Sequence, residues 1–288
     1  MMDPGLNGEM TRIHRSRSAD HLFIVFQKLL PQHLLSRIVG LVANSQINWL
    51  KNLFIRTVVK RYQVDLTEAA ESNISAYPSF NAFFTRSLKA GVRPVSGDIC
   101  CPADGVISAS GLIENGRILQ AKGIHYTPQK LLGGDAADYQ NGSFMTVYLS
   151  PKDYHRVHCP AAGDLVQARY IPGRLFSVNQ QTTTGLQDLF TINERLVMEF
   201  DTGFGKMAVI MVGAMIVAAI QPVWRDQPFQ ARTLIEEVFS PPRTFAMGEE
   251  LGRFQMGSTA IVLCQAQINW LRQSQEPVKM GEAIFTRD

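Results

Sequence analysis

The sequence predicts an α+β protein, in which a mainly antiparallel β core follows an N-terminal layer of amphipathic helices. Two observations predict it. Apolar side chains recur at helical spacing between residues 22 and 60, and from about Ile99 onward short β-rich runs alternate with Gly, Pro, Asn and Asp. A chain of 288 residues, 45% of them apolar, is long enough to bury a large core.

Three segments follow from this pattern. Residues 1–21 are polar, lack the features of a secretory signal and are expected to be a disordered leader. Residues 22–90 are predicted to be helical, with breaks near Pro31 and residues 44–46, a capping pattern at Thr67 and a short aromatic helix in "YPSFNAFFTRSL". Residues 91–288 form the β-rich domain.

The helical segment carries an unusual charge pattern. Between Leu22 and Arg61 there is no acidic residue, while six basic residues are interleaved with the apolar ones: Lys28, Arg37, Lys51, Arg56, Lys60 and Arg61. This pattern favours helices lying in an anionic membrane interface. An ordinary amphipathic layer with a solvated basic face is the alternative. Nucleic acid is a poorer partner, because the aromatic residues do not alternate with the basic ones, and no apolar run is long enough for a membrane span.

The four cysteines show no C-x-x-C pair and no regular spacing. This argues against a disulfide framework or a zinc site and favours a reducing compartment.

Polar residues gather at two places in the β-rich part. Asp104 lies in the turn "PADG", which opens a predicted strand, and Asp153, His155 and His158 lie within "YLSPKDYHRVHCP". The histidine cluster could ligate a metal, but His155 and His158 would point to opposite faces of an extended segment and a third ligand is missing. Two histidines in separate acid and base roles fit better.

A third place is "RFQMGSTAIVL", in which Gly257, Ser258 and Thr259 open an apolar run that is typical of a buried strand. A nucleophilic serine needs a base and an orienting carboxylate, and Ser258, His158 and Asp104 supply these residue types. A hydrolase with an intact Ser258 is one alternative, although no Gly-x-Ser-x-Gly elbow is present. A non-enzymatic membrane-binding β domain is another, but it leaves the "KDYHRVH" cluster without a purpose.

The sequence resembles the bacterial phosphatidylserine decarboxylases, which are pyruvoyl enzymes of the prokaryotic type I. The resemblance runs from the helical segment to the C-terminus. It is carried by "FFTRSLK", "PADG", "YLSPKDYHRVHCP", "YIPGRLFSVN", "MVGAMIVAAI" and "GEELGRFQMGST". One departure is Met256, where the family usually has Leu before Gly-Ser-Thr; this exchange conserves volume and apolarity.

The resemblance implies self-cleavage between Gly257 and Ser258, which would give a large β chain (residues 1–257) and a small α chain (residues 258–288). Ser258 would attack the preceding carbonyl with His158 as base and Asp104 as the orienting group, and would become a covalent pyruvoyl group. His155 would donate a proton during decarboxylation, and Asp153 would orient His155 or cap the turn.

The resemblance also implies the setting of this reaction. The pyruvoyl group, which derives from Ser258, would serve as the electron sink, without a metal. The substrate would be phosphatidylserine in an anionic membrane, and the product would be phosphatidylethanolamine. The two chains would form a heterodimer, with a dimer of these heterodimers as a further option. The protein would be bound peripherally at the cytoplasmic face of the cell membrane. No partnership with nucleic acid is expected.

Overall fold

The computed structural model describes residues 22–215, 219–229, 232–255 and 258–287. The expected disordered leader, residues 1–21, lies outside these ranges, as does Gly257. Helices come first along the chain and strands dominate after residue 98, so the predicted α+β class is confirmed.

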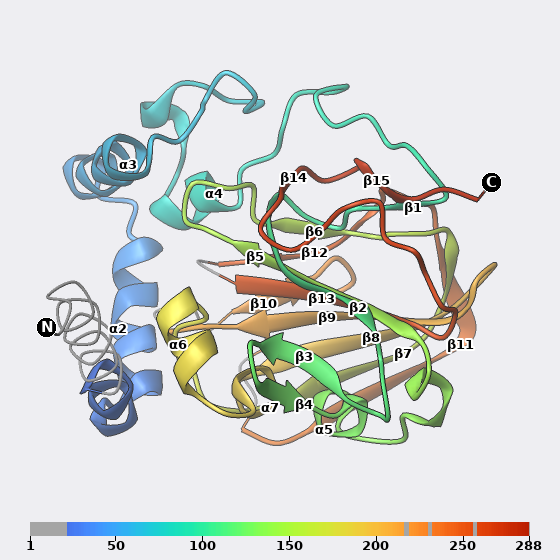
Figure 1. The fold of residues 1–288 in the computed structure, drawn as a ribbon. Coiled ribbons are helices and arrows are strands. Elements are labelled where there is room, and N and C mark those ends of the chain that lie inside the picture. The colour runs from blue at the N-terminus through green and yellow to red at the C-terminus, as the bar shows by residue number, and fades with distance from the viewer. Residues whose placement is uncertain (1–21, 216–218, 230–231, 256–257, 288) are drawn as a thin grey trace, which may run out of the picture.

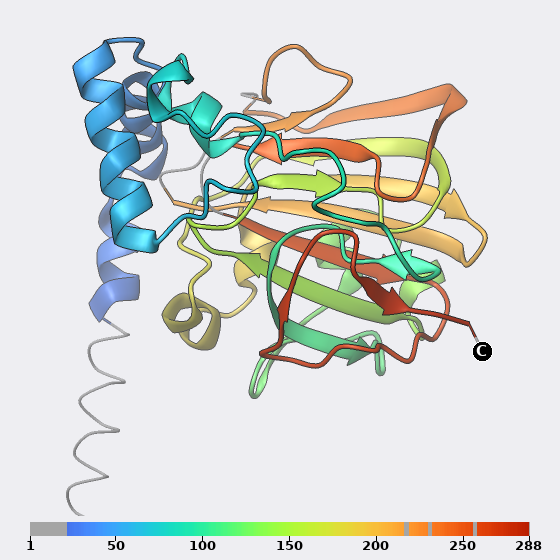
Figure 2. The ribbon, with the colours of Figure 1, turned by 90° about the horizontal axis from the view of Figure 1, so that it is seen from above.

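The N-terminal helices form one layer at the side of the β core (Figures 1 and 2). Residues 22–29 are helical, and the chain then breaks at Leu30 and Pro31 and again after Ala43, as predicted. The helices and short 3-10 turn that follow in this layer are α2 (Gln32–Ala43), α3 (Asn48–Tyr62), η1 (Ile74–Ala76) and α4 (Phe80–Phe84). The expected helix at Thr67 is absent from this described stretch, because Asp65 accepts hydrogen bonds from the Thr67 amide and hydroxyl and holds a turn instead.

The β core is built on one large antiparallel sheet. Among the described residues it has the strand order β11-β7-β8-β9-β13-β5-β2-β14. The bounds of these strands in chain order are β2 (Gly105–Leu112), β5 (Ser143–Leu149), β7 (Gly163–Ile171), β8 (Arg195–Thr202), β9 (Gly205–Gly213), β11 (Ile235–Phe245), β13 (Ser258–Cys264) and β14 (Pro277–Val278).

Smaller elements cover both faces of this sheet. A sheet of β10 (Ile220–Pro222), β12 (Glu250–Phe254) and β6 (Arg156–His158) packs on one face. The hairpin of β3 (Ile118–Ala121) and β4 (Ile124–Tyr126) covers the other with α5 (Pro128–Leu132), α6 (Gln180–Gly185) and α7 (Leu189–Ile192). The remaining elements are the pair β1 (Ile99–Cys100) and β15 (Ala283–Phe285) and the short turn η2 (Ala137–Tyr139).

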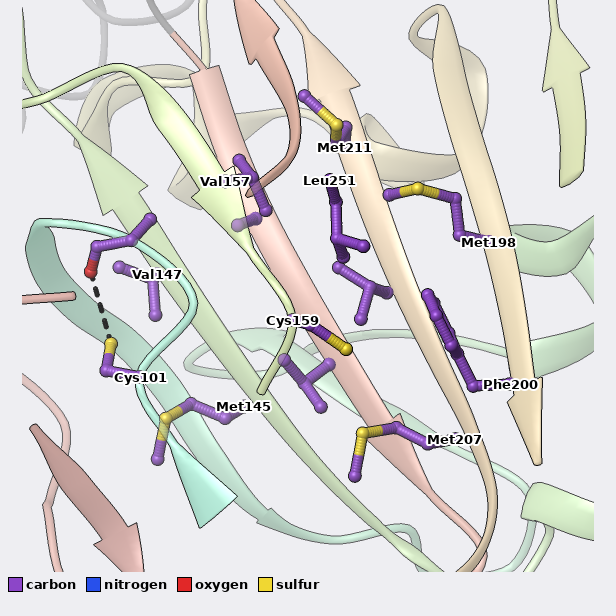
Figure 3. Packing of buried hydrophobic residues seen from close by; sticks show 14 of the residues in the cluster. Cys101, Met145, Val147, Val157, Cys159, Met198, Phe200, Met207, Met211 and Leu251 are labelled. Atoms are coloured by element: carbon purple, nitrogen blue, oxygen red, sulfur yellow. Dashed lines mark hydrogen bonds between the residues drawn. The ribbon is translucent and has the colours of Figure 1, made fainter. Parts of the chain in front are cut away.

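The main core lies between the large sheet and the three-stranded sheet. We call the face of the large sheet that borders this core the inner face. Figure 3 shows Val157 and Leu251 of the small sheet packed against Met198 and Met211 of the large one. The Cys101 thiol in the same core donates to the Ala103 carbonyl. Every cysteine in the chain is a buried free thiol.

Strand β13 occupies the middle of the large sheet. It pairs with β5 on one side and β9 on the other, and every residue from Ser258 to Cys264 is buried. Its side chains alternate, because Ala260, Val262 and Cys264 enter the inner-face core while Ile261 and Leu263 enter the core on the other face. A strand that is buried on both faces has apolar residues at successive positions, which explains the continuous apolar run in the sequence.

The central position of β13 predicts a large cost for truncating it. The change Ile261→Ala removes a fully buried side chain and should lower the free energy of unfolding by roughly 2–5 kcal/mol. The matched change Ile38→Ala, at a position 52% exposed, should cost much less. Urea unfolding of both variants measures the difference, and equal losses would contradict the placement of β13.

Candidate functional site

Ser258 lies at the head of the central strand, with backbone neighbours on both sides. It is paired with Leu149, the last residue of β5, and with Gly213, the last residue of β9. Alternation with Ala260 directs its side chain toward the inner face. The side chain is fully buried, and its Oγ has no hydrogen-bond partner in the described structure. A buried hydroxyl without a partner is uncommon in a folded protein and calls for a functional explanation.

Two connections place His155 at the same end of the sheet as Ser258. The turn after β5 leads directly to it, and its carbonyl accepts a hydrogen bond of 3.0 Å from the Phe254 amide at the end of β12. Phe254 lies four positions before Ser258 in the chain. His155 directly precedes β6, and its backbone lies beside the end of β12.

The contacts of the His155 ring define its protonation. Nδ1 lies 2.7 Å from the Asp153 carbonyl oxygen, which can only accept, so Nδ1 carries the proton. Complete burial lowers the pKa of His155 to about 3, so the ring is neutral near pH 7. Its Nε2 is buried and has no partner among the described atoms. The ring packs against Phe84 of α4 in a tilted arrangement, with the two centroids 4.0 Å apart and the ring planes inclined by 44°.

The Ser258 hydroxyl and the His155 Nε2 are both buried and both lack a hydrogen-bond partner in the described structure, which suits groups that meet a reactant. A neutral imidazole with a free Nε2 can take a proton from a nearby group and return it. Both atoms are shielded from water, which strengthens their electrostatic interactions with a bound reactant.

Asp153 has a capping role in the structure. Its carboxylate accepts hydrogen bonds of 2.7 Å from the amide and the hydroxyl of Ser150 and closes the turn after β5. Burial raises its pKa. The carbonyl of Asp153, and not its carboxylate, is the group that contacts His155. Asp153 therefore caps the turn with its carboxylate and contacts the His155 ring with its carbonyl.

His158 and Asp104 are neighbours through the backbone, since the His158 amide donates to the Pro102 carbonyl at 2.8 Å. Their side chains, however, have other partners. His158 contacts the Tyr154 hydroxyl through Nε2 at 3.0 Å and the Gly248 carbonyl through Nδ1 at 2.8 Å.

The carboxylate of Asp104 is held by Arg93. The guanidinium makes hydrogen bonds of 2.6 and 3.0 Å to it, and the Met280 amide donates to Oδ1. Alternation along β6 also turns His158 away from the inner face that Ser258 occupies. The structure therefore does not join Ser258, His158 and Asp104 in a hydrogen-bonded triad.

The parts of the chain that the structure describes do not form a metal site. No three His, Cys, Asp or Glu side chains there are grouped so that they could hold an ion.

Glu194 was missed by the sequence analysis. Its carbonyl accepts a hydrogen bond of 2.8 Å from the Gly213 amide, so Glu194, Gly213 and Ser258 lie side by side on three neighbouring strand ends. The Glu194 side chain is 5% exposed and its Oε1 has no partner in the described structure. Burial raises the pKa of Glu194 to about 7, and a hydrogen bond with Tyr170 partly offsets this rise. A lone Glu before a predicted strand carries no signal in one sequence that could have identified it.

Arg86 is a second residue that the sequence analysis passed over. It follows α4 and is 5% exposed, and its guanidinium donates through Nη2 to the Lys152 carbonyl at 3.1 Å. The Nε and Nη1 atoms have no partner within the described ranges. Burial lowers the pKa of Arg86, although an arginine stays charged at pH 7.

The raised pKa of Glu194 predicts a pH-dependent stability. The carboxyl binds its proton more tightly in the folded state, so the native protein loses stability as the pH rises from the ordinary value of 4.5 through about 7. Relative to Glu194→Gln, the wild type should lose up to about 3 kcal/mol between pH 4.5 and pH 8, at 1.36 kcal/mol per pKa unit. Urea unfolding of both proteins across this range measures the loss. The free energy of unfolding of the exposed control Glu114→Gln should vary with pH as that of the wild type does. If the free energy of unfolding of Glu194→Gln varied with pH in parallel to the wild type, it would contradict the raised pKa of Glu194.

Comparison with known proteins assigns the chain to a family. A family model described as phosphatidylserine decarboxylase matches residues 80–286, and a second, described as PSD, matches residues 22–63. A phosphatidylserine decarboxylase proenzyme from Ectopseudomonas mendocina is 51% identical over 277 residues, covering 91% of this chain and 97% of that protein.

Other relatives with the same name give the same result. The proteins from Pseudomonas putida strain F1 and Pseudomonas aeruginosa strain LESB58 are each 50% identical, covering 91% and 92% of this chain and 96% of their own lengths. The chain belongs to the phosphatidylserine decarboxylase family.

Proposed function

We propose that this chain decarboxylates phosphatidylserine to phosphatidylethanolamine after converting Ser258 into a pyruvoyl group. The single observation that carries the proposal is the buried, unpartnered Ser258 hydroxyl at the head of the central strand. The relatives are named proenzymes, which supports a processing step. The pyruvoyl group would supply an electron sink for the electron pair left when carbon dioxide departs.

Cleavage is proposed between Gly257 and Ser258. The Ser258 hydroxyl would attack the Gly257 carbonyl, and the peptide bond would become an ester. β-Elimination would release residues 1–257 with a terminal carboxylate and leave a dehydroalanine at position 258, which water would hydrolyse to the pyruvoyl group and ammonia. Strand β13 begins at Ser258, so the small chain would stay in place through its pairing with β5 and β9 on both sides. The result would be a heterodimer of two chains from one precursor.

The two histidines are proposed to act in different steps. His155 has an unpartnered Nε2, so it is suited to hold and return the proton at the carbon that loses carbon dioxide. The family resemblance gives His158, with Asp104, the role of base for Ser258 in cleavage, and we retain this assignment as a proposal. It requires the His158 Nε2 to leave the Tyr154 hydroxyl, while Nδ1 could keep its bond to the Gly248 carbonyl.

Membrane docking is proposed for the helical layer. Large apolar side chains are strongly exposed there, with Leu29, Leu41 and Trp49 being 79%, 76% and 69% exposed. The basic residues of the same helices are exposed except for Lys51, whose Nζ donates to the Ser75 carbonyl. Exposed apolar and basic side chains on one helical layer suit an anionic lipid interface.

The docked protein is proposed to lie peripherally at the cytoplasmic face of the cell membrane. The free cysteine thiols fit a reducing compartment. Among the described helices, none is long and apolar enough to cross a bilayer.

Two variants separate the roles of the histidines. His158→Ala should remain one full-length band on a denaturing gel, as should Ser258→Ala. His155→Ala should give two bands yet release carbon dioxide from phosphatidylserine at least 100-fold more slowly than the wild type, because general acid–base catalysis contributes on this scale. An uncleaved His155→Ala protein would instead make His155 the base for Ser258, and a fully active one would remove His155 from turnover.

A vesicle-binding experiment tests the docking surface. The double variant Leu41→Ser, Trp49→Ser should bind vesicles of anionic phospholipid at least 10-fold more weakly than the wild type, because each buried apolar side chain contributes about 1.5–3 kcal/mol. Raising the salt concentration should weaken wild-type binding further. The control Leu271→Ser, at a position 56% exposed outside the helical layer, should bind as the wild type does. Equal binding of all three proteins in co-sedimentation would contradict the docking role.

A further inference from the structure

Arg86 is a buried cation whose hydrogen-bonding capacity is largely unused. Its Nη2 donates to the Lys152 carbonyl, and one face of the guanidinium lies over the Phe83 ring, 5.3 Å from its centroid. The donors Nε and Nη1 meet no acceptor in the described structure, and no carboxylate there forms an ion pair with this side chain. An unpaired buried charge is costly, so an anion is expected to complete the site when the protein works.

Neighbouring guanidinium groups at this end of the molecule are already satisfied by the protein. Arg93 is paired with Asp104 and Glu68. Arg156 is paired with Glu250 and donates to the Thr85 carbonyl. Arg195 donates to four backbone carbonyls, those of Lys130, Leu131, Thr191 and Asn193. Arg86 therefore differs from these residues in having donors left for a ligand.

The position of Arg86 relates it to both the reaction centre and the helical layer. Its contact with Lys152 is made to the turn that directly follows Leu149, the partner of Ser258. Phe84, two residues earlier, packs against the ring of His155. Phe84 ends α4, which packs against α3 through Phe80 and Phe54. Arg86 thus lies at the junction between the proposed docking layer and the Ser258–His155 end of the sheet.

The docking layer, Arg86 and Ser258 follow one another in the same order as the acyl chains, the phosphodiester and the serine of the substrate. In phosphatidylserine the phosphodiester lies between the acyl-bearing glycerol and the serine amine and carboxylate. A lipid that keeps its chains at the helical layer and presents its serine to Ser258 would carry its phosphodiester past Arg86. Building on the proposed function, we infer that Arg86 binds the phosphodiester of the lipid headgroup.

The substrate also has a carboxylate, but that group suits Arg86 less well. Its negative charge leaves the carboxyl group as carbon dioxide departs, so an ion pair to it would stabilise the ground state more than the transition state and slow the reaction. The phosphodiester keeps its charge throughout. Its oxygens also match the planar array of guanidinium donors. Binding it stabilises both states equally and lowers KM without a matching change in kcat.

The test uses a soluble short-chain phosphatidylserine, so that membrane docking does not enter. Arg86→Gln should still be processed into two bands, and its KM should rise roughly 10- to 100-fold with a much smaller change in kcat, as expected for the loss of charge-assisted hydrogen bonds. The matched control Lys152→Gln removes an exposed positive charge from the adjacent turn and should keep the wild-type KM. Should Arg86→Gln fail to be processed, Arg86→Lys, which keeps the charge, should be processed and show an intermediate KM.

Two inhibitors identify the anion that Arg86 binds. Glycerophosphoethanolamine carries the phosphodiester without a carboxylate, and L-serine carries the carboxylate without a phosphate. Arg86→Gln should weaken inhibition by the first roughly 10-fold and leave inhibition by the second unchanged. The inference would be overturned if Arg86→Gln weakened inhibition by L-serine and not by glycerophosphoethanolamine. It would also be overturned if Arg86→Gln lowered kcat alone, or if KM rose in Lys152→Gln and not in Arg86→Gln. A wild-type protein that releases no carbon dioxide would instead refute the proposed function.

Discussion

The pairing of strand β13 on both of its edges is the constraint on which the rest of the structure depends. A strand between two antiparallel neighbours has every backbone hydrogen-bonding group in the ladder, and its side chains are fixed to alternate faces. A one-residue slip would exchange the faces of Ser258 and Thr259. The register with Leu149 and Gly213 therefore determines which core the Ser258 hydroxyl enters and which groups can reach it.

The same strand ends bring together residues from distant parts of the chain. The turn after β5 supplies Asp153 and His155, the end of β12 holds the His155 backbone, and Gly213 separates Ser258 from Glu194. The helical layer adjoins this end of the sheet (Figure 2). Gln27 and Gln32 accept from the amides of Ser177 and Leu175, and buried Leu175 lies beside Gly213. A few buried side chains thus link the helical layer to the strand ends beside Ser258.

Much of the fold could be predicted from local patterns. Helical periodicity indicated the N-terminal layer and its breaks, and the residues after Asp104 and after Gly257 indicated β2 and β13. Strand β11 gives little such signal, because it lies at an edge of the sheet and its alternating polar residues and two prolines do not resemble a buried strand. The apolar residues of β12 are few and are interrupted by charge and glycine.

The candidate site was predictable in its residue types and less so in its contacts. Ser258 and His155 stand out in the sequence, but the groups that surround each of them depend on strand order and register, which one sequence does not encode locally. The partners of His158 and Asp104 could not be foreseen either, since Gly248 and Arg93 reach them from distant segments. Glu194 and Arg86 owe their interest to burial without full partners, a property that only packing creates.

Intact mass measurement of the purified, unmutated protein tests the central claim most directly. The account predicts two chains, residues 1–257 and residues 258–288, with the smaller one beginning in a pyruvoyl group in place of Ser258. A protein that decarboxylates phosphatidylserine while its mass remains that of one chain of 288 residues with an unaltered serine would contradict it.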